Sequence, residues 1–496
     1  MEHDLSLLLP ILCPMLGGLL IVLVPNLGKG KAQQRFVAVV LAGTAALALN
    51  CLRGGEHALL LPITEIITIN FKIDNLSRFF SMLIVLMWLL SGIFSFSYMR
   101  HEGRHRQYYS FYLLSQGALL GLAYAGNYIT LYLCFEWMTL MTTPLVLHSG
   151  TREANRAAGK YLLYSVTGAS LGLLGIPFFM RYGTTLNFTP GGILDMAALR
   201  GHGELARTIA CLVLLGFGAK AGLYPLFAWL PAAHPVAPAP ASAVLSGIIT
   251  KAGVLAIVRV LYYAFGPEIL AGTWVQYFLI SVALCTVLMG STLALKEKLL
   301  KKRLAYSTVS QVSYILFGLF LLNETAMTGA LVHVAAHCVC KDALFLSAGA
   351  IIFQTGKTEV GQLRGTGKEM PVVFWCFTVA ALGLIGIPPF FGFLSKWYLC
   401  LGALESNLPV LSWLGPVILI VSALLTAAYL LPITVHGFFP GHDFDYASLV
   451  KREPDLRMRL PLLLLAMMTA FTVTPEPLTE LLCGIVSSVF ESGGRL

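Results

Sequence analysis

The sequence predicts an all-α polytopic membrane protein with about fourteen transmembrane helices. Of its 496 residues, 57% are hydrophobic and only 11% are charged, whereas a soluble domain is about 25% charged. The mean hydropathy is +0.79, and long apolar runs recur along the chain. A segment in lipid must satisfy its backbone polar groups internally, so these runs are expected to be helices. The composition excludes an ordinary soluble enzyme, a disordered protein and a nucleic-acid-binding protein.

The apolar runs give the positions of the spans to within a few residues. The first, Leu5 to Val24, has about 20 residues, enough to cross roughly 30 Å of hydrocarbon. Acidic residues precede it, Glu2 and Asp4, whereas a cleavable signal peptide begins with basic residues, so we predict a true span. The predicted spans are 5–25, 36–52, 77–98, 108–126, 127–148, 159–180, 207–224, 241–264, 274–295, 303–322, 327–353, 372–394, 409–438 and 459–475.

Basic residues gather in the loops that follow odd-numbered spans. Arg100, Arg104 and Arg106 follow span 3, for example, and Lys301 and Lys302 follow span 9. Because lysine and arginine are enriched in cytoplasmic loops, we predict that the odd loops are cytoplasmic and that both termini lie outside. The expected location is the inner (cytoplasmic) membrane of the cell. The net charge of +9 is therefore attributed to membrane orientation rather than to nucleic-acid affinity.

Two predicted spans are interrupted by helix breakers, and each carries a lysine beside the break. Span 7 reads GFGAKAGLYPLFAWLPAAHPVAPAP and contains Lys220, and span 12 reads GLIGIPPFFGFLSKWYL and contains Lys396. Spans 7 and 12 are five spans apart. Because five is an odd number, the broken helix of span 12 crosses the membrane in the opposite direction to that of span 7. Broken helices at matching places in inverted repeats point to a transport site. We therefore predict two inverted five-helix repeats, spans 4–8 and spans 9–13.

The repeats divide the chain into four parts: 1–107 with helices 1–3, 108–264 with the first repeat, 265–438 with the second, and 439–496 with helix 14 and a tail. The longest segment between spans, about 181–206, leaves no room for a domain that holds a flavin, a nucleotide or an iron–sulfur cluster. The ten cysteines lie mostly in apolar runs without metal-finger spacing. We expect no disulfide, no metal, no cofactor and no catalytic chemistry in this chain alone.

Several charged residues lie far from the ends of their spans, where a charge costs about 2.5–3.5 kcal/mol on insertion scales. Glu136 and Lys220 form the natural pair, because a nearby ammonium keeps a buried carboxylate ionised. Lys251 is too deep to reach either membrane surface easily. The alternatives are a glutamate that only ties two helices together, and lysines such as Lys220 and Lys396 that extend to the interface. The number of such charges argues against a purely structural protein.

Span 11 carries His333, His337 and Lys341 at i, i+4 and i+8, which places them on one helix face. Two histidines four residues apart can bind a metal, but a site needs further ligands and lysine is a poor one. A proton relay fits best, because imidazole titrates near neutrality and exchanges protons at either nitrogen. A structural hydrogen-bonded pair is the alternative. Secondary candidates are Asp342, which points about 100° away from Lys341, His234 in the first interrupted span, and Gln311 in a polar stripe of span 10.

Five segments carry a resemblance to a known family. They are FEWMTL (135–140), GFGAKAGLYPLFAWLPAAHPVAPAPASAVLSGIITKAGV (216–254), LKKRLAYSTVSQVSY (300–314), HVAAHCVCKDALFLSAG (333–349) and GIPPFFGFLSKWY (386–398). With them the chain resembles the antiporter-like membrane subunits shared by respiratory complex I, Mrp-type sodium/proton antiporters and energy-converting membrane hydrogenases. The resemblance covers roughly spans 3–13. It implies fourteen core helices, two inverted five-helix repeats and a central hydrophilic axis.

The resemblance also implies roles for the charged residues of the first repeat and for the end of the second. Glu136 matches the fifth-helix glutamate of the family, and Lys220 matches the lysine of the broken helix that pairs with it. Lys251 matches the eighth-helix lysine that continues the path. Lys396 matches the terminal residue of the second broken helix, which is lysine in some members and glutamate in others.

In the centre of the second repeat, Lys341 with His333 and His337 matches the relay of the family. The chain departs from the family at Asp342, where members usually have a small apolar residue. An acid at this position would alter the relay or pair with a neighbour. The chain also lacks the additional spans and long lateral helix of the most distal subunit of complex I, which argues against that identity.

The function expected from these features is that of a proton-translocating, antiporter-like subunit of a redox-driven ion-pumping complex. The expected partners are other membrane subunits, related antiporter-like subunits among them, and peripheral redox subunits. The alternative in the same class is a subunit of a multisubunit Mrp-type sodium/proton antiporter. Sodium needs oxygen ligands, whereas the buried candidates are mostly lysine and histidine, so protons are favoured. A membrane enzyme with its own redox centre is a further alternative.

Overall fold

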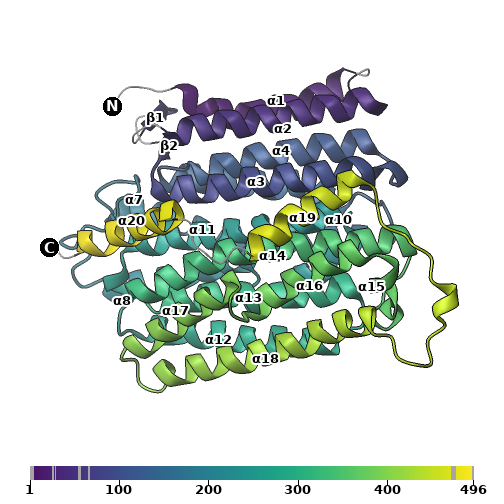
Figure 1. Cartoon of the computed structure of the whole chain (residues 1–496). Helices are drawn as coiled ribbons and strands as arrows, with labels where there is room; N and C mark the ends of the chain where they lie inside the picture. Colours follow the sequence, from purple (N-terminus) through teal and green to yellow (C-terminus); the bar gives the residue numbers. More distant parts are fainter. Residues whose placement is uncertain are drawn as a thin grey trace.

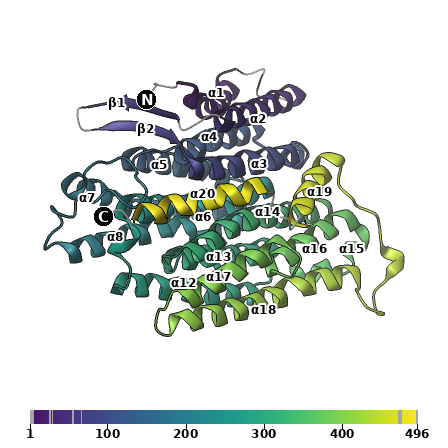
Figure 2. The ribbon, with the colours of Figure 1, turned by 60° about the vertical axis from the view of Figure 1, so that its left-hand side comes forward.

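The computed structural model describes residues 5–24, 27, 30–53, 57–64, 67–470 and 476–493. It is a bundle of long helices that run side by side (Figures 1 and 2). The prediction of a mostly helical membrane protein with many apolar helices is confirmed, and the two short strands described below depart from an all-α fold. Nine helices of the described ranges are long and apolar enough to span a membrane: Leu5–Leu23, Gly30–Arg53, Asn75–His101, Tyr128–Val146, Arg152–Tyr182, Ala239–Phe265, Trp274–Lys296, Glu324–Thr355 and Leu411–Phe438.

The count of fourteen spans stays a prediction. The remaining predicted spans fall on helices that are shorter or less apolar than these nine. Two of them are broken into short pieces at the positions where the sequence predicts an interruption, after Ala221 and after Ile385. Glycines follow both residues in the left-handed conformation, Gly222 with φ +87° and Gly386 with φ +85°, which an L side chain adopts only at a cost.

The chain begins with helices at one edge of the bundle (Figure 1). A short antiparallel hairpin, which the sequence did not indicate, connects the second helix to the third. The elements are η1 (Leu5–Leu8), α1 (Leu9–Leu23), α2 (Gly30–Arg53), β1 (His57–Pro62), β2 (Thr68–Ile73), α3 (Asn75–Tyr98), η3 (Met99–His101) and α4 (His105–Ala123).

The first predicted repeat continues from α4 and contains the first broken helix. Two π-helical turns, η4 and η5, flank its last α-helix. The elements are α5 (Tyr128–Val146), α6 (Arg152–Leu173), α7 (Gly175–Tyr182), α8 (Gly203–Ala221), α9 (Trp229–Val236), α10 (Ala239–Val244), η4 (Leu245–Ile249), α11 (Thr250–Val260), η5 (Leu261–Phe265) and η6 (Pro267–Ile269).

The second predicted repeat contains the longest helix, α14, and the second broken helix. Its elements are α12 (Trp274–Lys296), α13 (Leu300–Phe320), α14 (Glu324–Thr355), η7 (Val360–Leu363), α15 (Thr366–Glu369), α16 (Pro371–Ile385), α17 (Phe391–Glu405) and α18 (Leu411–Phe438). The chain continues with η8 (Tyr446–Ser448), α19 (Leu456–Ala470) and α20 (Glu476–Gly493).

Helix α20 was not foreseen as a separate element. The predicted last span, 459–475, corresponds to α19, and its final residues lie outside the described ranges. Both α19 and α20 pack against α3 and α14. The ring of Phe490 in α20 contacts that of Tyr262 at 5.9 Å, and α20 ends at the same end of the bundle at which α1 begins (Figure 1).

Polar residues just before the helices fix where several of them start. The side chains of Asp74, Asn127, Thr151 and Asn323 accept hydrogen bonds from backbone N–H groups in the first turns of α3, α5, α6 and α14. Such caps satisfy donors that the helix itself leaves unpaired.

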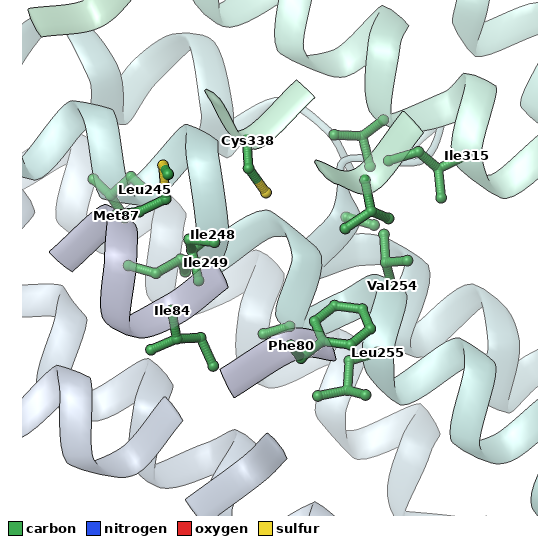
Figure 3. Packing of buried hydrophobic residues seen from close by; sticks show 14 of the residues in the cluster. Phe80, Ile84, Met87, Leu245, Ile248, Ile249, Val254, Leu255, Ile315 and Cys338 are labelled. Atoms are coloured by element: carbon green, nitrogen blue, oxygen red, sulfur yellow. The ribbon is translucent and has the colours of Figure 1, made fainter. Parts of the chain in front are cut away.

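Helix α14 lies at the centre of the bundle and is buried along most of its length. It contacts α3, α10, α13, α16, α17 and α19. Figure 3 shows part of this core, where Phe80, Ile84 and Met87 of α3 lie beside residues of η4, α11, α13 and α14. A helix that is apolar around its whole circumference is expected to be buried. The polar residues that α14 does carry are therefore surrounded by protein.

Glycines allow α6 and α8 to approach each other closely. A Cβ added at Gly168 would overlap the carbonyl oxygen of Gly216, and one added at Gly216 would overlap that of Gly168. Small residues at such contacts are typical of membrane helices, where backbone packing drives association. The contact fixes the distance between α6 and α8, the helix that carries Lys220.

An alanine at Gly168 should push α6 away from α8. We expect Gly168→Ala to lower the free energy of unfolding by about 1–3 kcal/mol, as overpacking typically does, and to lower the midpoint of thermal unfolding in detergent. Gly159→Ala is the control on the same helix, since a Cβ at Gly159 meets nothing within 4 Å. Equal midpoints for the two variants would contradict this account of the interface.

Candidate functional site

Lys220 is buried in the last turn of α8 and is held by hydroxyl groups. Its ammonium donates to Thr139 Oγ1 at 2.9 Å, to the Tyr161 hydroxyl at 2.5 Å and to Ser165 Oγ at 3.3 Å. The ammonium also lies 4.2 Å from the centroid of the Tyr161 ring, a distance at which a cation is attracted to the ring face. Neutral groups from α5 and α6 thus solvate this charge.

Glu136 lies on α5 one turn before Thr139 and is half-buried. Of the ion pairs in the described ranges, none joins Glu136 to Lys220. Lys220 of α8 therefore reaches α5 one turn after Glu136, through Thr139, without an ion pair to the glutamate. On the same side of α5, Leu133 and Trp137 are exposed. The carboxylate thus lies near the outer surface of the chain.

Lys251 and His337 join the first predicted repeat to the second. Lys251 lies in the first turn of α11 and is fully buried. Its ammonium donates to the carbonyl oxygen of Ser246 at 2.7 Å and contacts Nδ1 of His337 on α14. Ser246 belongs to the π-helical turn η4, and such turns occur frequently at functional sites.

His333 continues the line from His337 towards the second broken helix. The two imidazole rings lie 6.1 Å apart, as expected for neighbours four residues apart on a helix. His333 Nδ1 is hydrogen-bonded to Ser395 Oγ at 2.8 Å, and its ring stacks on Tyr314 at 5.5 Å. Ser395 directly precedes Lys396 in the sequence. The two histidines of α14 therefore lead to the helix that carries the next lysine.

Lys396 lies within α17, and its ammonium points back to the break. It donates to the carbonyl oxygens of Leu384 at 2.8 Å and Ile385 at 2.7 Å. These are the last residues of α16, whose carbonyls have no helical partner because the helix ends there. The ammonium also lies 5.2 Å from the ring centroid of Tyr314. The side chain is thus directed inward, whereas Trp397 beside it is exposed.

Lys341 is fully buried and donates to the carbonyl oxygen of Leu304 on α13 at 3.0 Å. It shares the α14 face with the two histidines but contacts α13 rather than the Lys251–His337 pair. Of the secondary candidates, Gln311 donates to Thr426 at 3.5 Å. Asp342 accepts a hydrogen bond from Ser91 at 3.2 Å.

His234 is fully buried, and its ring stacks on Phe345 at 4.7 Å. Neither of its ring nitrogens has a hydrogen-bond partner among the described residues.

Sequence reasoning identified the charged residues but missed the groups that hold them. Thr139, Tyr161, Ser165 and Ser395 are uncharged, and such residues are common in membrane helices. Spacing from a predicted charge gives no signal for them. Thr139 lies three residues after Glu136 but binds Lys220, and Ser395 directly precedes Lys396 but binds His333.

The fold and this line of residues define a polytopic membrane protein that keeps several amines and imidazoles buried among its helices. Comparison with known proteins places it more closely. The family model described as "NADH:quinone oxidoreductase/Mrp antiporter, TM" matches residues 125–439. A second model, "NADH-Ubiquinone oxidoreductase (complex I), chain 5 N-terminus", matches residues 64–109. The chain belongs to this family of antiporter-like membrane subunits, as the resemblance predicted.

Individual relatives come from different complexes. The chain is 30% identical over 452 residues to NADH-quinone oxidoreductase subunit N of Desulforudis audaxviator, covering 88% of this chain and 86% of the relative. It is 28% identical over 482 residues to a Na(+)/H(+) antiporter subunit of Alkalihalophilus pseudofirmus, covering 94% of each. A chain of the Mrp complex from Dietzia sp. DQ12-45-1b has the same fold, with a TM-score of 0.83, 23% identity, and coverage of 99% and 98%.

A buried charge held only by neutral groups should cost stability. We expect Lys220→Met to raise the free energy of unfolding by about 1–4 kcal/mol, the range seen when buried ion pairs are replaced by apolar residues, because it removes the desolvation cost of the charge. The midpoint of thermal unfolding in detergent measures it. Lys302→Met is the control, because Lys302 lies at the surface and pairs with Glu297 at 2.8 Å. A lower midpoint for Lys220→Met would mean that this ammonium stabilises the fold.

Proposed function

We propose that this chain translocates protons through the membrane along the buried axis, which we define as Glu136, Lys220, Lys251, His333, His337, Lys341 and Lys396. The observation that carries the proposal is the contact between Lys251 and His337. It joins two titratable side chains from different predicted repeats inside the protein. Amine and imidazole nitrogens can each accept and release a proton. No metal or cofactor is needed for such transfer.

The pair Glu136 and Lys220 is proposed as the switch at the start of the axis. Two unit charges about 4 Å apart attract by about 4 kcal/mol at an effective dielectric near 20. When the glutamate approaches, the ammonium of Lys220 is stabilised; when it withdraws, hydroxyl groups alone remain. An unpaired buried ammonium favours release of its proton. The proton then passes to a neutral Lys251, which becomes an ammonium.

In the second half of the axis, neighbouring groups contact one another. From Lys251 the proton moves to His337, then to His333, and finally to Lys396 through Ser395. The close spacing of His337, His333 and Ser395 supports this order. Each step leaves the donor neutral and the acceptor protonated, so a transfer between two members of the axis does not change the number of protons on it. Lys341 lies to one side, bonded to α13, and would tune the charge of the histidines.

The driving force must come from partners, and we propose that the chain belongs to a redox-driven complex in the inner (cytoplasmic) membrane. Relatives are subunits of NADH-quinone oxidoreductase and of Na(+)/H(+) antiporters. The position of Glu136 near the outer surface supports a neighbouring subunit there, because an ionised carboxylate facing lipid is costly. Peripheral redox subunits and related antiporter-like subunits are the proposed partners. The loop charges support termini on the outer side.

The alternative function is that of a subunit of a multisubunit sodium/proton antiporter. The 28% identity to a Na(+)/H(+) antiporter subunit over 94% of the chain favours it. The two functions differ in what drives the flux. Membrane vesicles that hold the native complex can be energised in turn with NADH, with hydrogen and with a sodium gradient. Proton movement with an electron donor supports the first function, and movement only with sodium supports the second.

The switch can be tested with Glu136→Gln, Lys220→Ala and the double variant in sealed vesicles that hold the native complex. We expect each single variant to slow proton translocation by about tenfold or more, which corresponds to about 1.4 kcal/mol. The double variant should be no slower than Lys220→Ala, because the glutamate acts through the lysine. Quenching of a pH-sensitive dye measures the rate.

The matched control for this series is Glu153→Gln. Glu153 is an exposed glutamate in the first turn of α6, outside the axis, and its variant should pump at the rate of the unaltered protein. Pumping at that rate by both Glu136→Gln and Lys220→Ala would refute the switch.

A further inference from the structure

Asp342 is buried on the side of α14 that faces α3 and η4, away from the histidine stripe. It is fully buried, and its Oδ2 accepts a hydrogen bond from the Ser91 hydroxyl at 3.2 Å. Its Oδ1 has no hydrogen-bond partner within the described part of the chain. A Cβ added at Gly247 would overlap Oδ1. Only a glycine in η4 therefore leaves room for this carboxyl group.

The carboxyl group lies beside the buried axis without being bonded to it. Gly247 lies four residues before Lys251, and its carbonyl accepts a hydrogen bond from the Cys338 thiol of α14 at 2.8 Å. The carbonyl of Ser246, the residue before Gly247, accepts a hydrogen bond from the Lys251 ammonium at 2.7 Å, so the ammonium and the Asp342 carboxyl group lie against the same turn of η4. No ion pair joins the two in the ranges that the structure describes. A proton would therefore pass between them through a bridging water molecule.

Opposite Lys251, Asp342 is bonded to Ser91, which is the first of a series of hydroxyl groups between α3 and α4. Ser91 and Ser95 lie four residues apart on α3, and Ser95 Oγ lies 3.4 Å from the hydroxyl of Tyr109. The ring of Tyr109 packs edge-on against that of Tyr108 at 5.2 Å. The hydroxyl of Tyr108 is buried and has no partner among the residues described.

The series ends at a pocket. The ring of Tyr108 packs edge-on against His148 at 5.5 Å, and His148 Nδ1 is buried without a partner in the described ranges. His148 lines a pocket of about 320 Å³ together with Tyr98, Glu102 and Lys301. These residues lie on or beside the loops that carry the basic residues. The pocket therefore opens at the face that loop charge predicts to be cytoplasmic.

We propose that His148, Tyr108, Tyr109, Ser95, Ser91 and Asp342, here called the hydroxyl line, form a proton-uptake route from this pocket to Lys251. The inference rests on the proposed function and adds a source of protons to it. A hydroxyl group accepts one proton while it donates another. With water molecules bridging the groups that are not bonded directly, a proton taken up at His148 releases one at Ser91. The carboxyl group of Asp342 gives its proton to the neutral amine of Lys251, and the resulting carboxylate is protonated again through Ser91.

A purely structural role explains the geometry less well. A carboxyl group that only tied α14 to α3 would be expected to have both oxygens bonded, because a buried unpaired oxygen costs free energy. The same holds for the Tyr108 hydroxyl and for His148 Nδ1. These three polar atoms lie in sequence from the pocket to Asp342, and each has an open position within the described part of the chain. Atoms that exchange protons with passing water molecules need such open positions.

The test measures proton translocation by the native complex in sealed membrane vesicles. Asp342→Asn keeps the shape of the side chain but removes the acid, and we expect it to slow translocation by about tenfold or more. Tyr108→Phe removes a hydroxyl that makes no hydrogen bond within the described part of the chain, and it should also slow translocation. In the Asp342→Asn background, Tyr108→Phe should have no additional effect, because both residues act in one route.

Tyr112→Phe is the matched control. Tyr112 stacks on Tyr108 in the same ring cluster, at 5.6 Å, but its hydroxyl donates to the Trp88 carbonyl at 2.7 Å and lies outside the hydroxyl line. If the cluster matters only for packing, Tyr112→Phe should be at least as harmful as Tyr108→Phe, and the proposal is overturned. It is also overturned if Tyr108→Phe pumps at the unaltered rate, which decides the matter even where Asp342→Asn fails to assemble.

The Glu136→Gln variant separates this inference from the proposed function. If Glu136→Gln is slow while Asp342→Asn and Tyr108→Phe pump at the unaltered rate, the axis works and the hydroxyl line is wrong. If all three pump at that rate, the proposed function itself fails. Slow translocation in all three, with normal amounts of assembled complex and an unaffected Tyr112→Phe, supports both.

Discussion

Each buried ammonium of the axis is held by uncharged groups, and this constraint determines much of the surrounding structure. A charge inside a membrane protein must be solvated by the protein itself. Lys220 has three hydroxyls, Lys341 has one carbonyl oxygen, and Lys396 has two. Lys251 has a carbonyl oxygen and an imidazole nitrogen. Neutral ligands stabilise the ammonium without binding it as tightly as a carboxylate would, so the proton can still leave.

The same protein contains a buried ion pair of the opposite kind. Arg259 of α11 donates to both carboxylate oxygens of Asp74, at 2.6 and 2.9 Å, and to Ser77 at 3.0 Å. Arginine keeps its charge under all ordinary conditions and matches a carboxylate with two parallel bonds. The pair therefore fastens α11 to the start of α3 permanently. Lysine, whose charge can be removed when buried, occupies the positions proposed for transfer.

The sequence predicted the positions of these charges better than their surroundings. Lys220, Lys251 and Lys341 stand out because a cation in an apolar run has a cost that only protein or water can offset. Both helix breaks could be predicted from proline and glycine. The hydroxyl partners could not, since serine and threonine fit into any helix by bonding to their own backbone. The hairpin β1–β2 was missed because its strands are short. Helix α20 was missed because it follows a proline at the end of the predicted span 459–475.

The helix irregularities and the lysines are best understood as one feature. In a regular helix each carbonyl oxygen accepts a bond from the N–H group four residues later, so little capacity remains for a cation. The end of α16 frees the carbonyls of Leu384 and Ile385, and both bind Lys396. In η4 the π-helical turn changes the backbone pattern around Ser246, whose carbonyl binds Lys251. If the breaks were made regular, these ammonium groups would lose their ligands. The glycines and prolines beside the lysines are therefore required by the charge as much as by the shape of the chain.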